Sequence, residues 1–326
     1  MNILLIRLKS IGDILFTLPA VHALRENFPD AKLHFLVSRE HAPLLRGFSE
    51  IDEIILLNRE VYRSKNPPAV CRETFRFLRR LRRTGFSLAV DFHGHGETEF
   101  FSWWSGAPER WGGLRQAGRG WTYTRGGRCD YQIHPAEWNL ALLRQCGLRT
   151  GEIRNEYVLP DDALNEAKQF FAANNLDAAR PVLFLQPFTS TPHKNWPLEN
   201  FLALARHWHS QGMQILFGGS PADRTALEPA RAAGFCISAG TPLLVSAGLT
   251  KLSTLVVGGD TGLLHLAVAM NRRVLMLMLS TAPGRTHPFQ HADWSVTPAG
   301  GKAVADIKAG AVIAACAEAF AELGVS

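Results

Sequence analysis

The chain has 326 residues, of which 46% are hydrophobic and 20% charged, and its 35 Lys and Arg against 29 Asp and Glu give a net charge of +6. This length exceeds what one hydrophobic core usually serves, so two domains are expected. The composition is that of a folded globular protein and excludes disordered, collagen-like and fibrous chains. The basic balance favours anionic partners without identifying them.

Cysteine usage and the N-terminus indicate the compartment. The five cysteines are scattered, odd in number and without a CxxC pair, so free thiols in a reducing compartment are predicted. Charges at Arg7, Lys9 and Asp13 interrupt the first residues, which therefore do not read as a signal peptide. No run of 18 apolar residues occurs. The protein is expected in the cytoplasm, where it can touch a membrane surface.

The first half of the chain alternates short apolar runs with helically spaced stretches. Strands are predicted at residues 2–8, 32–37, 53–57 and 87–92, and helices at 14–28, 41–47, 70–83, 97–105 and 135–146. This alternation predicts right-handed βαβ units, a parallel sheet and ligands at the carboxyl ends of its strands. Loops are expected over the rest of 94–128, where Gly, Trp and Arg dominate.

A second alternating series follows a polar connection at residues 149–160. Strands are predicted at 181–186, 214–218, 255–257 and 274–279, and helices at 161–175, 198–211, 223–233, 261–270 and 302–323. The predicted fold class is α/β, with two Rossmann-like parallel-sheet domains at 1–158 and 159–326. The terminal helix 302–323 is a candidate to pack back on the first domain.

The first chemical motif is GGDTGLLH at residues 258–265, after a buried strand and at the start of a helix. The free N–H groups and positive dipole end of such a helix bind phosphate, and Gly262 allows close approach. The hydroxyl of Thr261 adds a donor. Asp260 fits a simple N-cap equally well, and His265 fits a core histidine. No GK[ST] follows, so this is not a P-loop.

The second motif is QPFTSTPHKNWP at residues 186–197, at the end of a strand. Its three hydroxyls, including those of Thr189 and Ser190, suit a diphosphate, and Lys194 would neutralise charge on a leaving phosphate. A Ser/Thr-rich surface loop explains it about as well.

The third motif is SIGD at residues 10–13, after the first strand. It is not GxGxxG, which argues against a dinucleotide site in the first half. A carboxylate at Asp13 would face the ligand crevice and would serve as general base for a hydroxyl nucleophile. As an N-cap it would be structural only.

Two further strand ends carry polar residues. GGSPAD at residues 218–223 is a turn that would seat a nucleoside, with Asp223 accepting from ribose hydroxyls or capping a helix. HGHGE at residues 93–97 lacks HExxH spacing and Cys partners, so His93 is expected to orient an acceptor or sugar and no metal site is predicted.

The one biased stretch is RFLRRLRR at residues 76–83, a basic helix end. Its plain interpretation is favourable charge at a helix C-terminus on a solvated face. The functional interpretation is contact with anionic lipid head groups or a phosphorylated acceptor. Nucleic-acid binding is motivated only by the basic pI, because the aromatics do not alternate with the arginines as a stacking platform requires.

Three segments together resemble the ADP-heptose:lipopolysaccharide heptosyltransferases of glycosyltransferase family 9. They are SIGDILFTLPAVHALRENFP, TPHKNWPLENF and GGDTGLLHLAVAMNRRVLML, and they occur in the family's order over essentially the whole chain. The resemblance implies the GT-B fold, with an acceptor-binding N-terminal domain and a donor-binding C-terminal domain that face each other across a cleft. It also implies a peripheral enzyme at the cytoplasmic face of the inner membrane, with no cofactor.

The implied reaction is metal-independent, inverting transfer of a heptose from ADP-L-glycero-D-manno-heptose to a sugar hydroxyl of the lipopolysaccharide inner core. The resemblance assigns catalytic roles to Asp13, as base, and to Lys194. The candidate donor contacts are Thr189, Ser190, Lys194, Gly218, Asp223, Asp260, Thr261, Gly262 and His265. The candidate acceptor or sugar contacts are Ser10, Gly12, His93 and Arg119.

Two departures from the family keep alternatives open. The turn at residues 221–223 is less acidic than in characterised members, and residues 93–128 match the family only loosely. A transferase that uses another nucleotide-activated sugar, or a catalytically silent nucleotide-sugar-binding protein, are the alternatives. A silent binder would have no use for a base in the opposite domain, which favours an enzyme. Residues 1–158 hold 23 basic and 17 acidic residues, whereas residues 159–326 hold 12 of each, so the basic excess lies in the predicted acceptor half.

Overall fold

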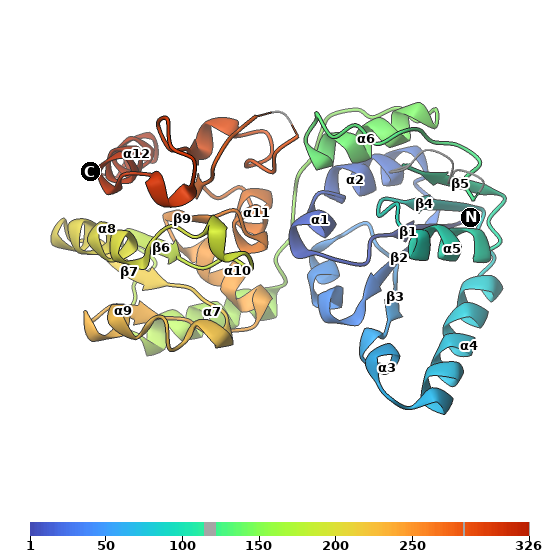
Figure 1. The fold of residues 1–326 in the computed structure, drawn as a ribbon, viewed down its shortest axis with the longest axis horizontal. Coiled ribbons are helices and arrows are strands. Elements are labelled where there is room, and N and C mark those ends of the chain that lie inside the picture. Colours follow the sequence, from blue (N-terminus) through green and yellow to red (C-terminus); the bar gives the residue numbers. More distant parts are fainter. Residues whose placement is uncertain (114–121, 283, 326) are drawn as a thin grey trace. The chain divides into compact units, whose positions relative to one another are not determined.

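The computed structural model describes residues 1–113, 122–282 and 284–325. The chain forms two compact units, Met1–Asn155 and Glu156–Ser326, against a predicted boundary after residue 158. Figure 1 shows that each unit is a sheet with helices on both of its faces.

The first unit contains a five-stranded parallel sheet in the order β3-β2-β1-β4-β5. Its elements are β1 (Asn2–Ile6), α1 (Ile11–Leu15), α2 (Leu18–Asn27), β2 (Lys32–Ser38), the 3-10 helix η1 (Arg39–Gly47), β3 (Glu53–Leu57), α3 (Arg59–Arg63), α4 (Pro67–Arg83), β4 (Leu88–Asp91), α5 (Gly96–Trp104), β5 (Glu109–Gly112) and α6 (Pro135–Gln145). Strands β2 and β3 are added on one side of β1, and β4 and β5 on its other side. The switch point of the strand order therefore lies between the neighbouring strands β1 and β4. A doubly wound sheet binds its ligand at the carboxyl ends of the strands on either side of this point.

The two faces of this sheet follow from the alternation of side chains along its strands. Leu4 and Ile6 of β1 join the core under α4 and α5, where Phe77 of α4 packs edge-on against Phe101 of α5 at 4.9 Å. The helices α2 and α6 pack together. Asn139 of α6 donates through Nδ2 to the carbonyl of Phe16 at 2.8 Å, which ties α6 to the segment after β1.

The second unit contains a six-stranded parallel sheet in the order β11-β10-β9-β6-β7-β8. Its elements are α7 (Asp161–Ala173), β6 (Val182–Gln186), η2 (Pro192–Lys194), α8 (Leu198–Ser210), β7 (Gln214–Phe217), η3 (Pro221–Asp223), α9 (Glu228–Ala232), β8 (Cys236–Ile237), α10 (Leu243–Leu252), β9 (Leu255–Gly259), α11 (Gly262–Ala269), β10 (Val274–Leu277), η4 (Ala292–Trp294), β11 (Ser295–Val296), η5 (Val304–Asp306) and α12 (Ala309–Glu322). In this sheet the switch point of the strand order lies between β6 and β9, so the carboxyl ends of these two strands define the ligand crevice of this unit.

Alternating residues of each strand divide the core of the second unit into two layers. On β6, Leu183 and Leu185 face the layer covered by α8, α9 and α12, whereas Val182 and Phe184 face the layer of α7, α10 and α11. The indole of Trp196, 1% exposed, anchors the first layer and donates to the carbonyl of Ile307 at 2.8 Å. This bond fixes the chain directly after Lys194.

Several predicted boundaries were wrong, each for a local reason. The helix predicted at 14–28 is two helices, because Pro19 begins a new one after Thr17. The terminal helix begins at Ala309, not at residue 302, because Asp306 accepts from the backbone N–H groups of Lys302 and Ala303 and closes a 3-10 turn before it. Helix α12 packs on α8 of its own unit, where Phe320 meets Trp208 edge-on.

All five cysteines are free, as predicted. Within the described ranges, no helix has the length and apolar character needed to cross a bilayer.

Candidate active site

The site in the second unit is built on the carboxyl ends of β6, β9 and β10. A cavity of about 280 Å³ opens there. It is lined by His193, Lys194, Asp260, Leu277, Met278, Leu279, Ser280, Arg285, Thr286, Lys302, Ala303 and Val304. Apolar walls suit a base or sugar ring, and two lysines and one arginine against one carboxylate suit an anion. The cavity is therefore cationic although its unit, with 12 basic and 13 acidic residues, is not.

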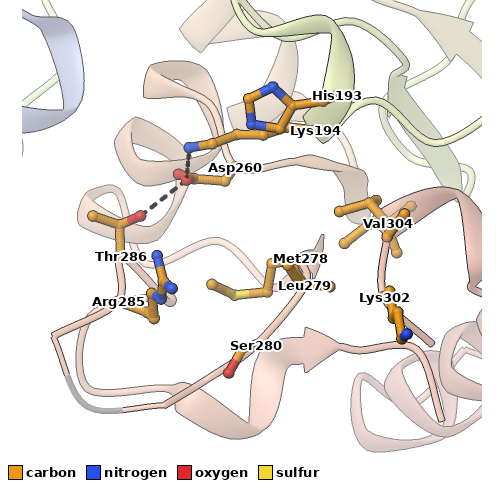
Figure 2. A pocket seen from close by; sticks show the side chains of 12 residues that line it. His193, Lys194, Asp260, Met278, Leu279, Ser280, Arg285, Thr286, Lys302 and Val304 are labelled. Carbon is orange, nitrogen blue, oxygen red and sulfur yellow. Dashed lines mark hydrogen bonds and ion pairs between the residues drawn. The ribbon is translucent and has the colours of Figure 1, made fainter. Parts of the chain in front are cut away.

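Asp260 is the centre of the polar side of this cavity. Its Oδ2 lies 2.8 Å from Nζ of Lys194 and accepts from the hydroxyl of Thr286 at 2.9 Å. Its Oδ1 lies 3.0 Å from Nε2 of His265, and this nitrogen must donate because an ionised carboxylate only accepts. Figure 2 shows Lys194 and Thr286 converging on Asp260, with Met278 below Asp260 in this view.

The alternative interpretation of Asp260 as a simple N-cap is wrong. Thr261 occupies the N-cap of α11 and its hydroxyl accepts from the N–H of Leu264 at 3.4 Å. Gly262 is the first helical residue, so the amide end of α11 follows directly after Asp260. The Asp260 carboxylate therefore does not cap α11, and instead bonds to the side chains of Lys194, His265 and Thr286.

The electrostatics of Asp260 follow from these partners. Burial alone would raise the pKa of its carboxyl, but the hydrogen bond and charge of His265, together with Lys194, hold this pKa well below its usual range. An Asp with a depressed folded-state pKa stabilises the fold fully above its unfolded pKa of about 4, and this contribution is lost as the pH falls further.

Asp260→Asn is therefore expected to be less stable than the wild type by about 2 kcal/mol at pH 7, the loss of charged hydrogen bonds. The difference in Tm between the two proteins should shrink as the pH falls below about 4, because the unfolded wild type then binds a proton that the folded carboxylate does not take up. Thermal unfolding from pH 7 to pH 3 measures it, with Asp30→Asn, at an exposed site, as the control. A difference independent of pH would show that the charge of Asp260 does not stabilise the fold.

The loop of residues 186–197 presents Lys194 to the cavity, and the donor contacts of its hydroxyls stay a prediction. The hydroxyl of Thr189 donates to the carbonyl of Thr191 at 2.8 Å and accepts from the Thr191 N–H at 3.1 Å. Ser190 is exposed. Neither lines the cavity. A side chain at Gly259 would meet the methyl of Thr189 at 2.6 Å, so glycine there lets this loop lie against the end of β9.

The predicted nucleoside turn lies at the end of β7, outside the lining of the cavity. Gly218 packs against Gln186 and Phe184 so closely that a Cβ would lie 2.4 Å from the phenyl ring. Oδ2 of Asp223 accepts from the N–H and the hydroxyl of Ser220, both at 2.7 Å. The capping role weighed for Asp223 is present, and its ribose contact stays a prediction.

The site in the first unit lies at the carboxyl ends of β1 and β4. Asp13 lies in the first turn of α1, after Ser10 at the N-cap, so it is not itself the cap. Its Oδ2 lies 2.6 Å from a guanidinium nitrogen of Arg7 and accepts from the Ser10 hydroxyl at 3.2 Å. No other described residue bonds to this carboxylate, so Oδ1 has room to take a proton. The side chain of Asp13 is 39% exposed.

Arg7 is the residue that the sequence analysis missed in this unit. It ends an apolar run and is 8% exposed. Its guanidinium donates to the carbonyls of Phe92, at 2.6 Å, and Lys9, at 3.2 Å, and so bridges the ends of β4 and β1. These bonds hold the guanidinium in place against Asp13.

The buried carboxylate of Asp91 fixes the backbone at the start of the HGHGE segment, residues 93–97. Oδ1 of Asp91 accepts from the N–H groups of His93 and Gly94, and Oδ2 accepts from the hydroxyl of Tyr123 at 2.7 Å. Burial raises the pKa of both Asp91 and Tyr123. His93 is buried and its Nδ1 accepts from the N–H of Leu8 at 3.3 Å, so it joins the two strand ends.

The remaining predicted residues divide as follows. Ser10, Gly12 and Asp13 come together at the start of α1. Arg119 lies outside the described residues. In the described part of the chain, no group of three or more His, Cys, Asp or Glu side chains is placed to hold a metal ion. Arg285, Thr286 and Lys302 were missed. Arg285 and Thr286 follow β10, the neighbour of β9 in the sheet, and Lys302 follows β11, the neighbour of β10.

Each of the two units has a doubly wound parallel sheet with polar residues at the switch point of its strand order. These features define a two-domain α/β transferase of the GT-B fold. The glycosyltransferase family 9 structure from Veillonella parvula covers 98% of this chain and 97% of its own, with a TM-score of 0.85 at 18% identity. The heptosyltransferase WaaC of E. coli with ADP-2-deoxy-2-fluoro heptose covers all of both chains, with a TM-score of 0.77 at 20% identity.

The sequence comparisons give the family. The family model described as glycosyltransferase family 9 (heptosyltransferase) matches residues 74–305, so the chain belongs to this family. The lipopolysaccharide core heptosyltransferase OpsX of Haemophilus influenzae is 23% identical over 301 residues, 90% of this chain and 83% of that protein.

Proposed function

We propose that this enzyme transfers a heptose from ADP-L-glycero-D-manno-heptose to a sugar hydroxyl of the lipopolysaccharide inner core, with inversion at the anomeric carbon. The observation that carries the proposal is the cavity at the ends of β6, β9 and β10, where Lys194, Arg285 and Lys302 surround apolar walls. A nucleoside diphosphate sugar combines the apolar and anionic parts that such a lining suits. WaaC, with the same fold, was solved with a fluorinated ADP-heptose.

In this mechanism Asp13 is the general base. It removes the proton of the acceptor hydroxyl as that oxygen bonds to C1 of the heptose, and the bond from C1 to the diphosphate oxygen breaks. Arg7 and Ser10 bind Oδ2, so Oδ1 receives the proton. Attack from the face opposite the leaving group inverts the configuration at C1.

The leaving ADP takes the electron pair of the broken bond, and its growing negative charge must be stabilised. Lys194, positioned by Asp260, and the N–H groups at the start of α11 are the proposed donors. Asp260 does not contact phosphate in this proposal, because two anions would repel. These donors neutralise the charge without a metal ion, in agreement with a sequence that has no DxD motif.

The proposed acceptor is anchored in lipid, so the reaction takes place at the cytoplasmic face of the inner membrane with the enzyme peripheral to it. The first unit carries 23 basic and 16 acidic residues, a net charge of +7, which favours a phosphorylated, anionic acceptor. His93, Ser10, Gly12 and Arg119 stay the proposed acceptor contacts.

A panel of ADP, UDP, GDP and dTDP sugars, tested by thermal shift and then by turnover with heptose-deficient lipopolysaccharide, tests the proposal. ADP-heptose is expected to raise Tm most and to be the donor consumed. Stabilisation by UDP but not ADP would favour the alternative of another nucleotide-activated sugar. Stabilisation by ADP-heptose without turnover would favour a silent binding protein.

A further inference from the structure

Helix α4 exposes a stripe of arginines around an aromatic residue. Its buried side is formed by Phe77 and Leu81, and the opposite side carries the α4 stripe, Arg72, Phe75, Arg76, Arg79 and Arg83. These positions repeat at the helical spacing and share one side of the helix. Phe75 is 64% exposed, far more than a phenylalanine in a core, and the Arg79 guanidinium lies 6.0 Å from its ring centroid.

Helix α5 adds a second group of exposed aromatics beside α4. Phe100 and Trp103 are 40% and 42% exposed, and both rings lie about 6 Å from the ring of Trp104. The indole of Trp104 donates to the carbonyl of Leu78 at 2.9 Å. Leu78 is three residues from Phe75 in the same helix, so this bond fixes Trp104, and with it the neighbouring rings of Phe100 and Trp103, beside α4.

Within the described part of the unit, the charges of the α4 stripe are not compensated by acidic side chains. Arg80 pairs with Glu53, and Arg82 bonds to the carbonyl of Trp104. The four arginines of the α4 stripe make no ion pair with any described residue. A solvated helix face needs no large exposed aromatics, so the combination of Phe75, Phe100 and Trp103 with unpaired guanidiniums points to an anionic, partly apolar partner.

We propose that the α4 stripe and the α5 aromatics dock this enzyme on an anionic phospholipid bilayer. Guanidiniums pair with lipid phosphates while the aromatic rings enter the interface between head groups and acyl chains. Pairing with a second copy through this face would bring like charges together, which disfavours self-association. The inference rests on the proposed function, since an enzyme with a lipid-anchored acceptor works at that surface.

Vesicle flotation tests this docking with phosphatidylcholine vesicles and with vesicles that also contain phosphatidylglycerol. The wild type is expected to bind only the second kind. Each basic residue near an anionic surface contributes about fivefold to binding. The combined variant Arg72→Gln, Arg76→Gln, Arg79→Gln and Arg83→Gln should lose on the order of a hundredfold or more in partition coefficient. The matched control, with the same charge change on exposed residues of the second unit, is Lys168→Gln, Arg180→Gln, Arg206→Gln and Arg231→Gln.

A second variant tests the apolar half of the docking surface. Phe75→Ser with Phe100→Ser should weaken binding at least tenfold, whereas Val158→Ser with Leu323→Ser, also at exposed apolar positions, should not. Circular dichroism and Tm confirm that each variant is folded. Wild-type binding by either the arginine variant or the phenylalanine variant, or no binding of the wild type to anionic vesicles, would overturn the inference. So would a dimer in sedimentation that the arginine variant abolishes, or preferential binding to DNA.

Turnover with a lipid-free oligosaccharide acceptor separates this inference from the proposed function. The arginine variant should retain wild-type turnover there, because none of its substitutions touches Asp13 or the cavity. Vesicle binding by a wild type that transfers no sugar would remove the proposed function and leave membrane docking in place. Normal sugar transfer by a wild type that does not bind vesicles would remove membrane docking and leave the proposed function in place.

Discussion

Replacing Asp13 with Asn is expected to lower kcat for sugar transfer about a thousandfold while leaving the Kd for ADP within twofold of the wild type. The magnitude is that of a lost general base. Asparagine keeps the shape of the side chain and still accepts from Arg7 through its amide oxygen, so the start of α1 should not rearrange. Single-turnover transfer and calorimetric titration with ADP measure the two quantities.

The control for this variant is Asp30→Asn, an exposed carboxylate of the same unit that lies away from the carboxyl ends of β1 and β4. It should change neither quantity. If Asp13→Asn lost transfer and ADP binding together, or lowered Tm by several degrees, its carboxylate would be a structural partner of Arg7 and not a base.

Arg7 illustrates what the sequence could not show. Its position at the end of an apolar run predicts only a strand end, and its role depends on the carbonyl of Phe92, which is 85 residues away. Asp13, by contrast, could be proposed as a candidate site residue from the sequence, because it follows the first strand of a βαβ unit, where the topology places ligands. The structure adds the geometry, with Oδ2 held and Oδ1 open.

The elements that were missed lack the patterns on which sequence interpretation depends. Strands β8 and β11 have two residues each, too few to show alternation. Helix α10 is buried on most of its surface beside α7, so its apolar residues show no amphipathic period. Strand β5 is four residues of mixed polarity and is specified by pairing with β4. Tertiary contacts, and not local sequence patterns, therefore determine the secondary structure of these four elements.

The role of Asp260, a residue of the candidate site, also depends on tertiary contacts that the sequence pattern does not reveal. As an Asp before a helix, it fits an N-cap by every local rule, and only the following Thr261 competes for that place. Its actual partners, Lys194 and Thr286, are 66 and 26 residues away. The strand order β10-β9-β6 brings their loops together, and the sequence predicts parallel sheets without predicting this order.

The partnership of Lys194 with Asp260 determines what removal of the lysine should do. Lys194→Ala is expected to lower kcat by a few hundredfold, the effect of losing a preorganised charge at a developing anion, and to weaken ADP binding as well. The affinity falls for two reasons, because the diphosphate loses a cation and also meets the carboxylate of Asp260, whose side chain is only 15% exposed.

The double variant Lys194→Ala with Asp260→Asn separates these two causes. It should bind ADP more tightly than Lys194→Ala alone, because the uncompensated carboxylate is gone, while kcat stays low. Calorimetry with ADP and steady-state turnover measure the cycle, and Lys168→Ala on the exposed side of α7 is the control. If the double variant bound ADP no better than the single one, Asp260 would not face the diphosphate. If Lys194→Ala kept wild-type kcat and ADP affinity, the charge of the leaving group would have to be stabilised by Arg285, Lys302 and the amides of α11 instead.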